Sequence, residues 1–155
     1  MHLESRSYRS RARGFTLLEV LVAMVVLSIG LLGLSGMQTT SLRNNHSAFL
    51  RSQATVVTND ILDRMRANRD SAVAGDYDIT YATATPATAC AGGSGCSATD
   101  VANRNLNEWR AYVQRLPEGE GEISVTAAGV TEVKVRWADT RDAANKLQIV
   151  TRAQI

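Results

Sequence analysis

Three residues that could take part in chemistry stand close together near the N-terminus, at the border of a long apolar run: Gly14, Phe15 and Glu19. Glu19 is the most informative of them, because a carboxylate near the start of a membrane-spanning segment is costly and is usually functional. Taken alone, Glu19 could also reach the nearby interface without any further role. Gly14 is the only convincing small-residue cleavage site, and it precedes the apolar run instead of following it. We therefore expect a cut after Gly14 and a role for the charge of Glu19.

The apolar run is long enough to cross a membrane. No charged residue occurs from Val20 to Leu42, and about twenty helical residues cover the hydrocarbon core of ~30 Å. We assign residues 15–37 to this span. The first fourteen residues carry four arginines against one glutamate, which predicts a cytoplasmic N-terminus and an outside location for everything after the span. An ordinary secretory signal would have a shorter core followed by its cleavage site, and an uncleaved signal anchor would leave Glu19 unexplained.

Composition argues against nucleic-acid binding and against catalysis. Without the leader's four arginines and Glu4, the 17 basic and 15 acidic residues become 13 and 14, so the remainder has no basic excess to attract nucleic acid. The sequence holds no GxSxG, HExxH or P-loop pattern, and we expect no enzymatic activity, no metal and no cofactor. Trp109 and Trp137 fall on apolar faces, which predicts core positions rather than ligand platforms.

Two cysteines, Cys90 and Cys96, enclose a glycine-rich stretch. They lack a CxxC spacing, and His2 and His46 are far away in sequence, so a redox or metal pair is the weaker interpretation. Behind a membrane-targeting N-terminus, a structural disulfide explains the two cysteines better. Closing so short a loop would stabilise by about 2 kcal/mol, which would fix the loop rather than hold the fold.

Periodic apolar residues predict an α+β domain that includes the second half of a helix of about fifty residues. That half is amphipathic, and its expected apolar face consists of Leu42, Phe49, Val56, Val57, Ile61 and Met65. Asp60 and Arg64 have the i,i+4 spacing of a surface ion pair. Spacing then predicts a short strand at 77–81, a loop at 83–98, a helix at 100–116, and strands at 122–127, 132–137 and 147–152. Short links predict that the last three form an antiparallel meander, covered by the amphipathic helix.

The segment Arg13-Gly14-Phe15-Thr16-Leu17-Leu18-Glu19-Val20 resembles the class III signal of type IV pilins and type II secretion pseudopilins. The resemblance implies that a membrane aspartyl protease, the prepilin peptidase, cuts between Gly14 and Phe15 and then N-methylates Phe15. Glycine suits the cut because the protease must approach the backbone closely. The resemblance also implies that Glu19 pairs with the N-terminal amine of a neighbouring subunit. Where major pilins typically carry a proline, this chain has Gly36.

The rest of the chain resembles minor pilins of the PilV type, through residues 59–68, the cysteine loop and the tryptophan-bearing helix that ends in Leu116-Pro117. This implies a type IV pilin-like fold: a cleaved leader at 1–14, a transmembrane or filament-core helix at 15–37, and an extracytoplasmic head at 38–155. The implied role is initiating or capping pilus assembly. Implied partners are other minor pilins, the major pilin, the prepilin peptidase, the inner membrane and a tip adhesin, with no nucleic acid. A minor pseudopilin of type II secretion and a signal-anchored enzyme or receptor stay open as alternatives.

Overall fold

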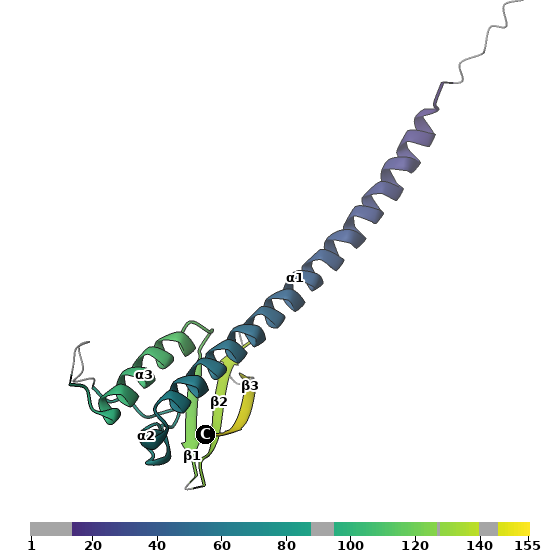
Figure 1. The fold of residues 1–155 in the computed structure, drawn as a ribbon. Helices are drawn as coiled ribbons and strands as arrows, with labels where there is room; N and C mark the ends of the chain where they lie inside the picture. Colours follow the sequence, from purple (N-terminus) through teal and green to yellow (C-terminus); the bar gives the residue numbers. More distant parts are fainter. Residues whose placement is uncertain (1–13, 88–94, 127, 140–145) are drawn as a thin grey trace, which may run out of the picture. The chain divides into compact units, whose positions relative to one another are not determined.

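The computed structural model describes residues 14–87, 95–126, 128–139 and 146–155. In chain order its elements are α1 (Leu17–Ala67), α2 (Arg69–Val73), α3 (Ala98–Val113), β1 (Glu120–Val125), β2 (Val130–Ala138) and β3 (Lys146–Gln154) (Figure 1). The chain divides into two compact units, residues 1–43 and residues 44–155, with α1 contributing to both. The expected α+β class is confirmed: a long N-terminal helix precedes a small antiparallel sheet and a further helix.

In the first unit, the described residues consist of a short lead and the apolar half of α1. Thr16 caps the helix, because its Oγ1 accepts a hydrogen bond of 3.3 Å from the backbone N–H of Glu19. All the large apolar side chains that the structure describes in this unit are exposed, with exposed fractions between 45% at Val20 and 84% at Phe15. Within the described part of the chain, α1 is the one helix that is long and apolar enough to cross a membrane. An apolar surface of this extent is costly in water, so we expect lipid or other proteins to cover it.

Polar side chains around the end of the apolar run are satisfied inside the helix. The hydroxyl of Ser28 donates to the carbonyl oxygen of Met24 at 2.7 Å. Further along, Thr39 donates to Ser35 at 3.1 Å and Thr40 donates to Gly36 at 3.2 Å. Each of these hydroxyl groups donates to the carbonyl oxygen four residues earlier, so it needs no hydrogen-bond partner outside the helix. The helix runs through Gly36 without a break.

The second unit begins with the amphipathic half of α1. This half buries Leu50, Ala54, Thr58, Ile61, Leu62 and Met65. The expected apolar face was therefore wrong in part, since Phe49 and Val56 are 57% and 62% exposed, as is Leu42 of the first unit at 69%. The reason is geometric: one residue turns a helix by 100°, so the buried row through Leu50 lies a quarter-turn away from the heptad row through Phe49.

The sheet is an antiparallel meander in the order β1-β2-β3, as expected. Central strand β2 buries one face completely, with Thr131, Val133, Val135 and Trp137 at 0–1% exposure. The strand expected at 77–81 is wrong, because only one isolated bridge forms there, between Ile79 and Ile123. Asp78 limits it, since its carboxylate accepts from the backbone N–H of Val125 and replaces the next ladder bond. The bridge still brings the buried Tyr77 and Ile79 into the core.

Helix ends also differ from the expected positions. α3 begins two residues earlier than expected, because Ser97 and Asp100 form a reciprocal capping box. It stops at Val113 rather than Leu116, and the chain then turns with Glu118 at a positive φ of 48°. The long helix stops at Ala67, and the chain continues into α2, a separate short helix that ends at Val73.

Both tryptophans are core residues, as the sequence predicted. Trp109 is fully buried and Trp137 is 1% exposed. The indole Nε1 of Trp109 donates to the carbonyl oxygen of Val57 at 3.1 Å, which ties α3 to α1. Gly121 lies against the same ring, so closely that a Cβ there would come within 2.4 Å of Trp109 Cη2. The core therefore depends on a glycine in β1.

Ion pairs link the strands on the outer face of the sheet. Lys134 contacts Glu122 at 2.7 Å and Glu132 at 3.0 Å, and these two carboxylates raise the pKa of its ammonium group. Hydrogen bonds from Arg152 and Lys134 hold the pKa of Glu132 below its ordinary value. On α1, the expected pair of Arg64 and Asp60 forms at 2.9 Å. These pairs are solvent-accessible, so each one contributes little to stability by itself.

We expect Gly121→Ala to destabilise the protein by about 1–3 kcal/mol, because the added methyl overpacks the ring of Trp109. Ser124→Ala, an exposed change on the same strand, is the matched control. Thermal melting of the full-length chain in detergent measures both. Equal melting temperatures for the two variants would contradict the close packing of Gly121 on Trp109.

We expect the capping box to be sensitive to acid. The Ser97 hydroxyl donates to Asp100 and holds the pKa of that carboxyl below its ordinary value of 3.8. Because the folded pKa is depressed, the stabilisation is present above the unfolded value and is lost as the pH falls through the folded one. Ser97→Ala should cost about 1 kcal/mol at pH 7, with a smaller difference from the wild type at pH 3. Ser52→Ala, exposed on α1, should change nothing, and a cost for Ser97→Ala that is independent of pH would contradict this assignment.

Candidate functional site

Gly14 is not needed as a glycine by the fold. It is exposed, and a Cβ added to it would meet no atom within 4 Å. It is also absent from the described glycines with a positive φ, which are Gly75, Gly95 and Gly129. A requirement for glycine at this position would therefore arise from a protein that binds the backbone there, as a processing protease must.

Phe15 and Glu19 line the same shallow hollow on the first unit. Its other lining residues are Val20, Ala23, Met24 and Leu27. The Thr16 cap fixes Glu19 in the first turn of α1, where the helix dipole favours a negative charge. The carboxylate thus stands among apolar side chains, one helical turn from the residue that would carry a new amine after a cut at Gly14. In apolar surroundings such a charge needs a cationic partner.

The cysteine prediction is not tested by the described residues. Cys90 lies outside them, whereas Cys96 directly precedes the N-cap residue of α3. No cysteine in the described ranges is free, but the pairing of Cys90 with Cys96 stays a prediction. Over the same ranges, no group of three or more histidine, cysteine, aspartate or glutamate side chains could hold a metal ion.

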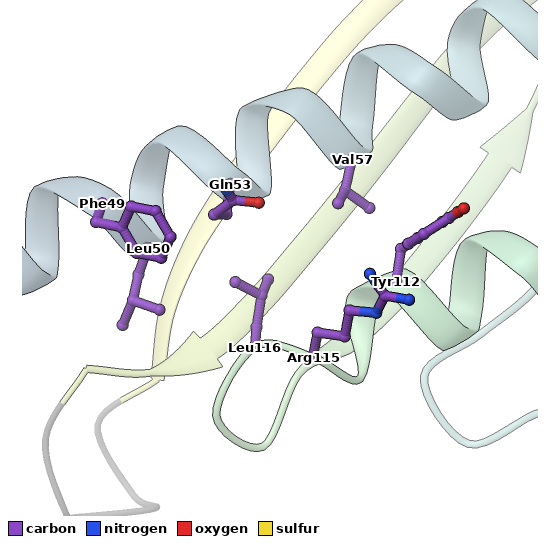
Figure 2. A pocket seen from close by; sticks show the side chains of 7 residues that line it. All are labelled: Phe49, Leu50, Gln53, Val57, Tyr112, Arg115 and Leu116. Atoms are coloured by element: carbon purple, nitrogen blue, oxygen red, sulfur yellow. The ribbon is translucent and has the colours of Figure 1, made fainter.

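A second candidate site lies in the second unit, in a groove between α1 and the end of α3. Figure 2 shows its lining side chains, which are Phe49, Leu50, Gln53, Val57, Tyr112, Arg115 and Leu116. Sequence periodicity did not single out Tyr112 or Arg115, because Tyr112 lies off the buried ridge of α3 and Arg115 lies just after the helix ends. The groove arises only when two helices far apart in sequence come together, so the sequence carried no local signal for it.

Comparisons with known families match most of the N-terminal two thirds of the chain. Residues 9–35 match the family described as prokaryotic N-terminal methylation motif. Residues 36–107 match the family described as type IV pilin Tt1218. No curated protein and no solved structure matched the sequence. The first match covers Gly14, Phe15 and Glu19, and the second covers the amphipathic half of α1 and most of α3.

We expect Gly14→Glu to block processing, so that the precursor persists on a gel. The fold leaves open space at this position, hence a loss of processing would report on the protease rather than on folding. Gly14→Ala is the matched control: it adds one methyl group and should be processed slowly rather than not at all. Normal maturation of Gly14→Glu would contradict the assignment of the cleavage site.

Proposed function

We propose that the chain is a type IV pilin-like protein, as the matches to the N-terminal methylation motif and to the type IV pilin family support, and that it is a minor pilin of a type IV pilus, of the PilV type. In this role it helps to initiate or cap pilus assembly together with other minor pilins. The observation that carries the proposal is the position of Glu19, a carboxylate one turn into a helix whose apolar surface the chain leaves uncovered.

The chemistry of assembly follows from that carboxylate. After a cut between Gly14 and Phe15, the new amine of Phe15 is a cation attached to an apolar helix end. A carboxylate and an amine that are each costly in hydrocarbon neutralise one another when two subunits meet. Pairing between Glu19 of one subunit and the methylated Phe15 of its neighbour would therefore draw subunits out of the bilayer and into register.

Three features of α1 and the head fit a minor pilin. The segment 59–68, on which the PilV resemblance rests, closes α1 at Ala67. Trp109 then fixes α3 to that helix through its bond to Val57. Gly36 stands where major pilins typically carry a proline. The helix is continuous at this point, with no proline ring to interrupt it.

The location and partners follow from the same role. The arginines of the leader favour a cytoplasmic N-terminus, which would put residues 15–37 in the inner membrane and the head in the periplasm. From there the subunit would enter the pilus. Its partners would be the prepilin peptidase, other minor pilins, the major pilin and a tip adhesin. The subunit would have a structural role and no enzymatic activity.

We expect Glu19→Ala to be cut and inserted normally but to be depleted from pili, because the charge acts in subunit pairing and not at the scissile bond. A strain that lacks the chain, complemented with the wild type, Glu19→Ala or Glu19→Asp, provides the test. The measurement is the amount of the chain in sheared pili and the number of surface pili. Glu19→Asp keeps the charge and should retain part of the function.

Wild-type amounts of Glu19→Ala in sheared pili would contradict the pairing role. Secreted proteins measured in the same strains separate the proposal from its main rival. A loss of protein secretion with normal pili in the strain that lacks the chain would favour a minor pseudopilin of type II secretion, which shares the same export and assembly chemistry.

A further inference from the structure

The groove between α1 and α3, defined by the seven lining residues named above and called the docking groove from here on, has the features of a binding surface for one side chain. Its volume is about 240 Å³, below the ~300–1,000 Å³ of pockets that take small-molecule ligands. The floor is formed by Leu50 and Leu116, which are 5% and 4% exposed, while Phe49 and Tyr112 on the rim are 57% and 38% exposed (Figure 2).

The docking groove is mainly apolar, and its one cationic side chain, Arg115, has no carboxylate partner among the described residues. Its polar lining groups are the amide of Gln53, the hydroxyl of Tyr112 and the guanidinium of Arg115, and no acidic side chain lines it. The guanidinium of Arg115 lies over the ring of Tyr112, 4.8 Å from its centroid, which holds it at the rim. Arg115 is absent from the ion pairs of the described residues.

A second arginine at the junction of α1 and α3, Arg64, has the carboxylate partners that Arg115 lacks. Arg64 of α1 is paired within the chain, with Asp60 at 2.9 Å and with Glu108 of α3 at 2.5 Å. Hydrogen bonds and attraction from these two carboxylates outweigh the effect of burial and raise the pKa of Arg64. At this junction Arg64 is therefore paired with carboxylates of its own chain. Arg115, beside the apolar groove, is left to pair with a carboxylate of another molecule.

We propose that the docking groove receives a large apolar side chain from the amphipathic helix of a neighbouring, different pilin-type subunit, and that a carboxylate one turn away on that helix pairs with Arg115. This rests on the proposed function, which places subunits with their helices side by side. Phe49 and Val56 are exposed and lie seven residues apart, so they fall on one side of α1. They add an apolar surface beside the groove along which a second helix could lie.

A symmetric pair of two copies fits the docking groove less well. Two copies that met groove to groove would bring the two Arg115 guanidinium groups together with no acid among the lining residues to separate them. Like charges juxtaposed in this way oppose association. The groove therefore favours a partner whose helix carries the acid that this chain does not provide there.

Site-specific photo-crosslinking in the full-length, membrane-inserted chain tests the proposal. The probe is p-benzoylphenylalanine in place of Gln53, an exposed lining residue, in living cells of the native host. The expected product joins Gln53 to the amphipathic helix of another pilin-type subunit, within about one turn of an aspartate or glutamate, as mapped by mass spectrometry. The same probe in place of Val150, which is 47% exposed on β3, should not give this product.

Charge variants of Arg115 test the second half of the proposal. In the chain with the probe at position 53, Arg115→Glu should lower the yield of the crosslink about tenfold, whereas Arg115→Lys should stay within about twofold of the parent. Equal amounts of processed chain in the membrane show that folding and insertion are intact. A yield that is insensitive to the charge at Arg115 would overturn the role of the carboxylate.

The identity of the crosslinked partner tests which molecule occupies the docking groove. A crosslink to a second copy of this chain, to lipid alone, or to nothing would overturn the proposed occupant. These outcomes differ from a failure of the proposed function, in which the chain would be missing from wild-type pili. A crosslink to the helix of a secretion pseudopilin would support the docking groove while contradicting the pilus assignment.

Discussion

The change of surroundings along α1 is the constraint on which the remaining structure depends. Up to residue 37 the helix is apolar on every side, and its large apolar side chains are exposed. From Leu50 onward only one side is apolar, and the head must cover only that side. α3 and one face of the three-stranded sheet suffice for this, with Leu50, Ile61 and Met65 contributing to the same core as Trp109 and Trp137. A small head is enough because it covers only half of a helix.

Much of the fold could be predicted because it is encoded by local periodicity. Alternation in the last third gave the three strands in their order, and the four- and three-residue steps through Leu106, Trp109 and Val113 gave α3. Predictions that needed tertiary knowledge were less successful. Phe49 and Val56 are as apolar as Leu50, and only the position of α3 and the sheet decides which row becomes the core. Ile79 alternates correctly with its neighbours, but the carboxylate of Asp78 shortens the pairing to one bridge.

The two candidate sites differ in the same way: one is encoded locally in the sequence, and the other depends on tertiary packing. Gly14, Phe15 and Glu19 could be singled out from the sequence, because their meaning lies in their offsets along a single segment, with a small residue before an apolar run and an acid within it. The docking groove could not, since Tyr112 and Arg115 become neighbours of Phe49 only through the packing of two helices. Its charge pattern was equally hidden: nothing in the sequence distinguishes Arg64, which has two carboxylates, from Arg115 at the groove.

The hydroxyl groups in α1 have a consequence for how the segment changes its surroundings. The hydroxyl groups of Ser28, Thr39 and Thr40 donate hydrogen bonds to carbonyl oxygens of their own helix. These three hydroxyl groups need no partner outside the helix, so they can pass from acyl chains to apolar helices and back without exchanging a hydrogen bond. Glu19 carries the only charge between Phe15 and Leu42. The direction of such a transfer, and its reversibility, would then depend on whether this one carboxylate has a partner.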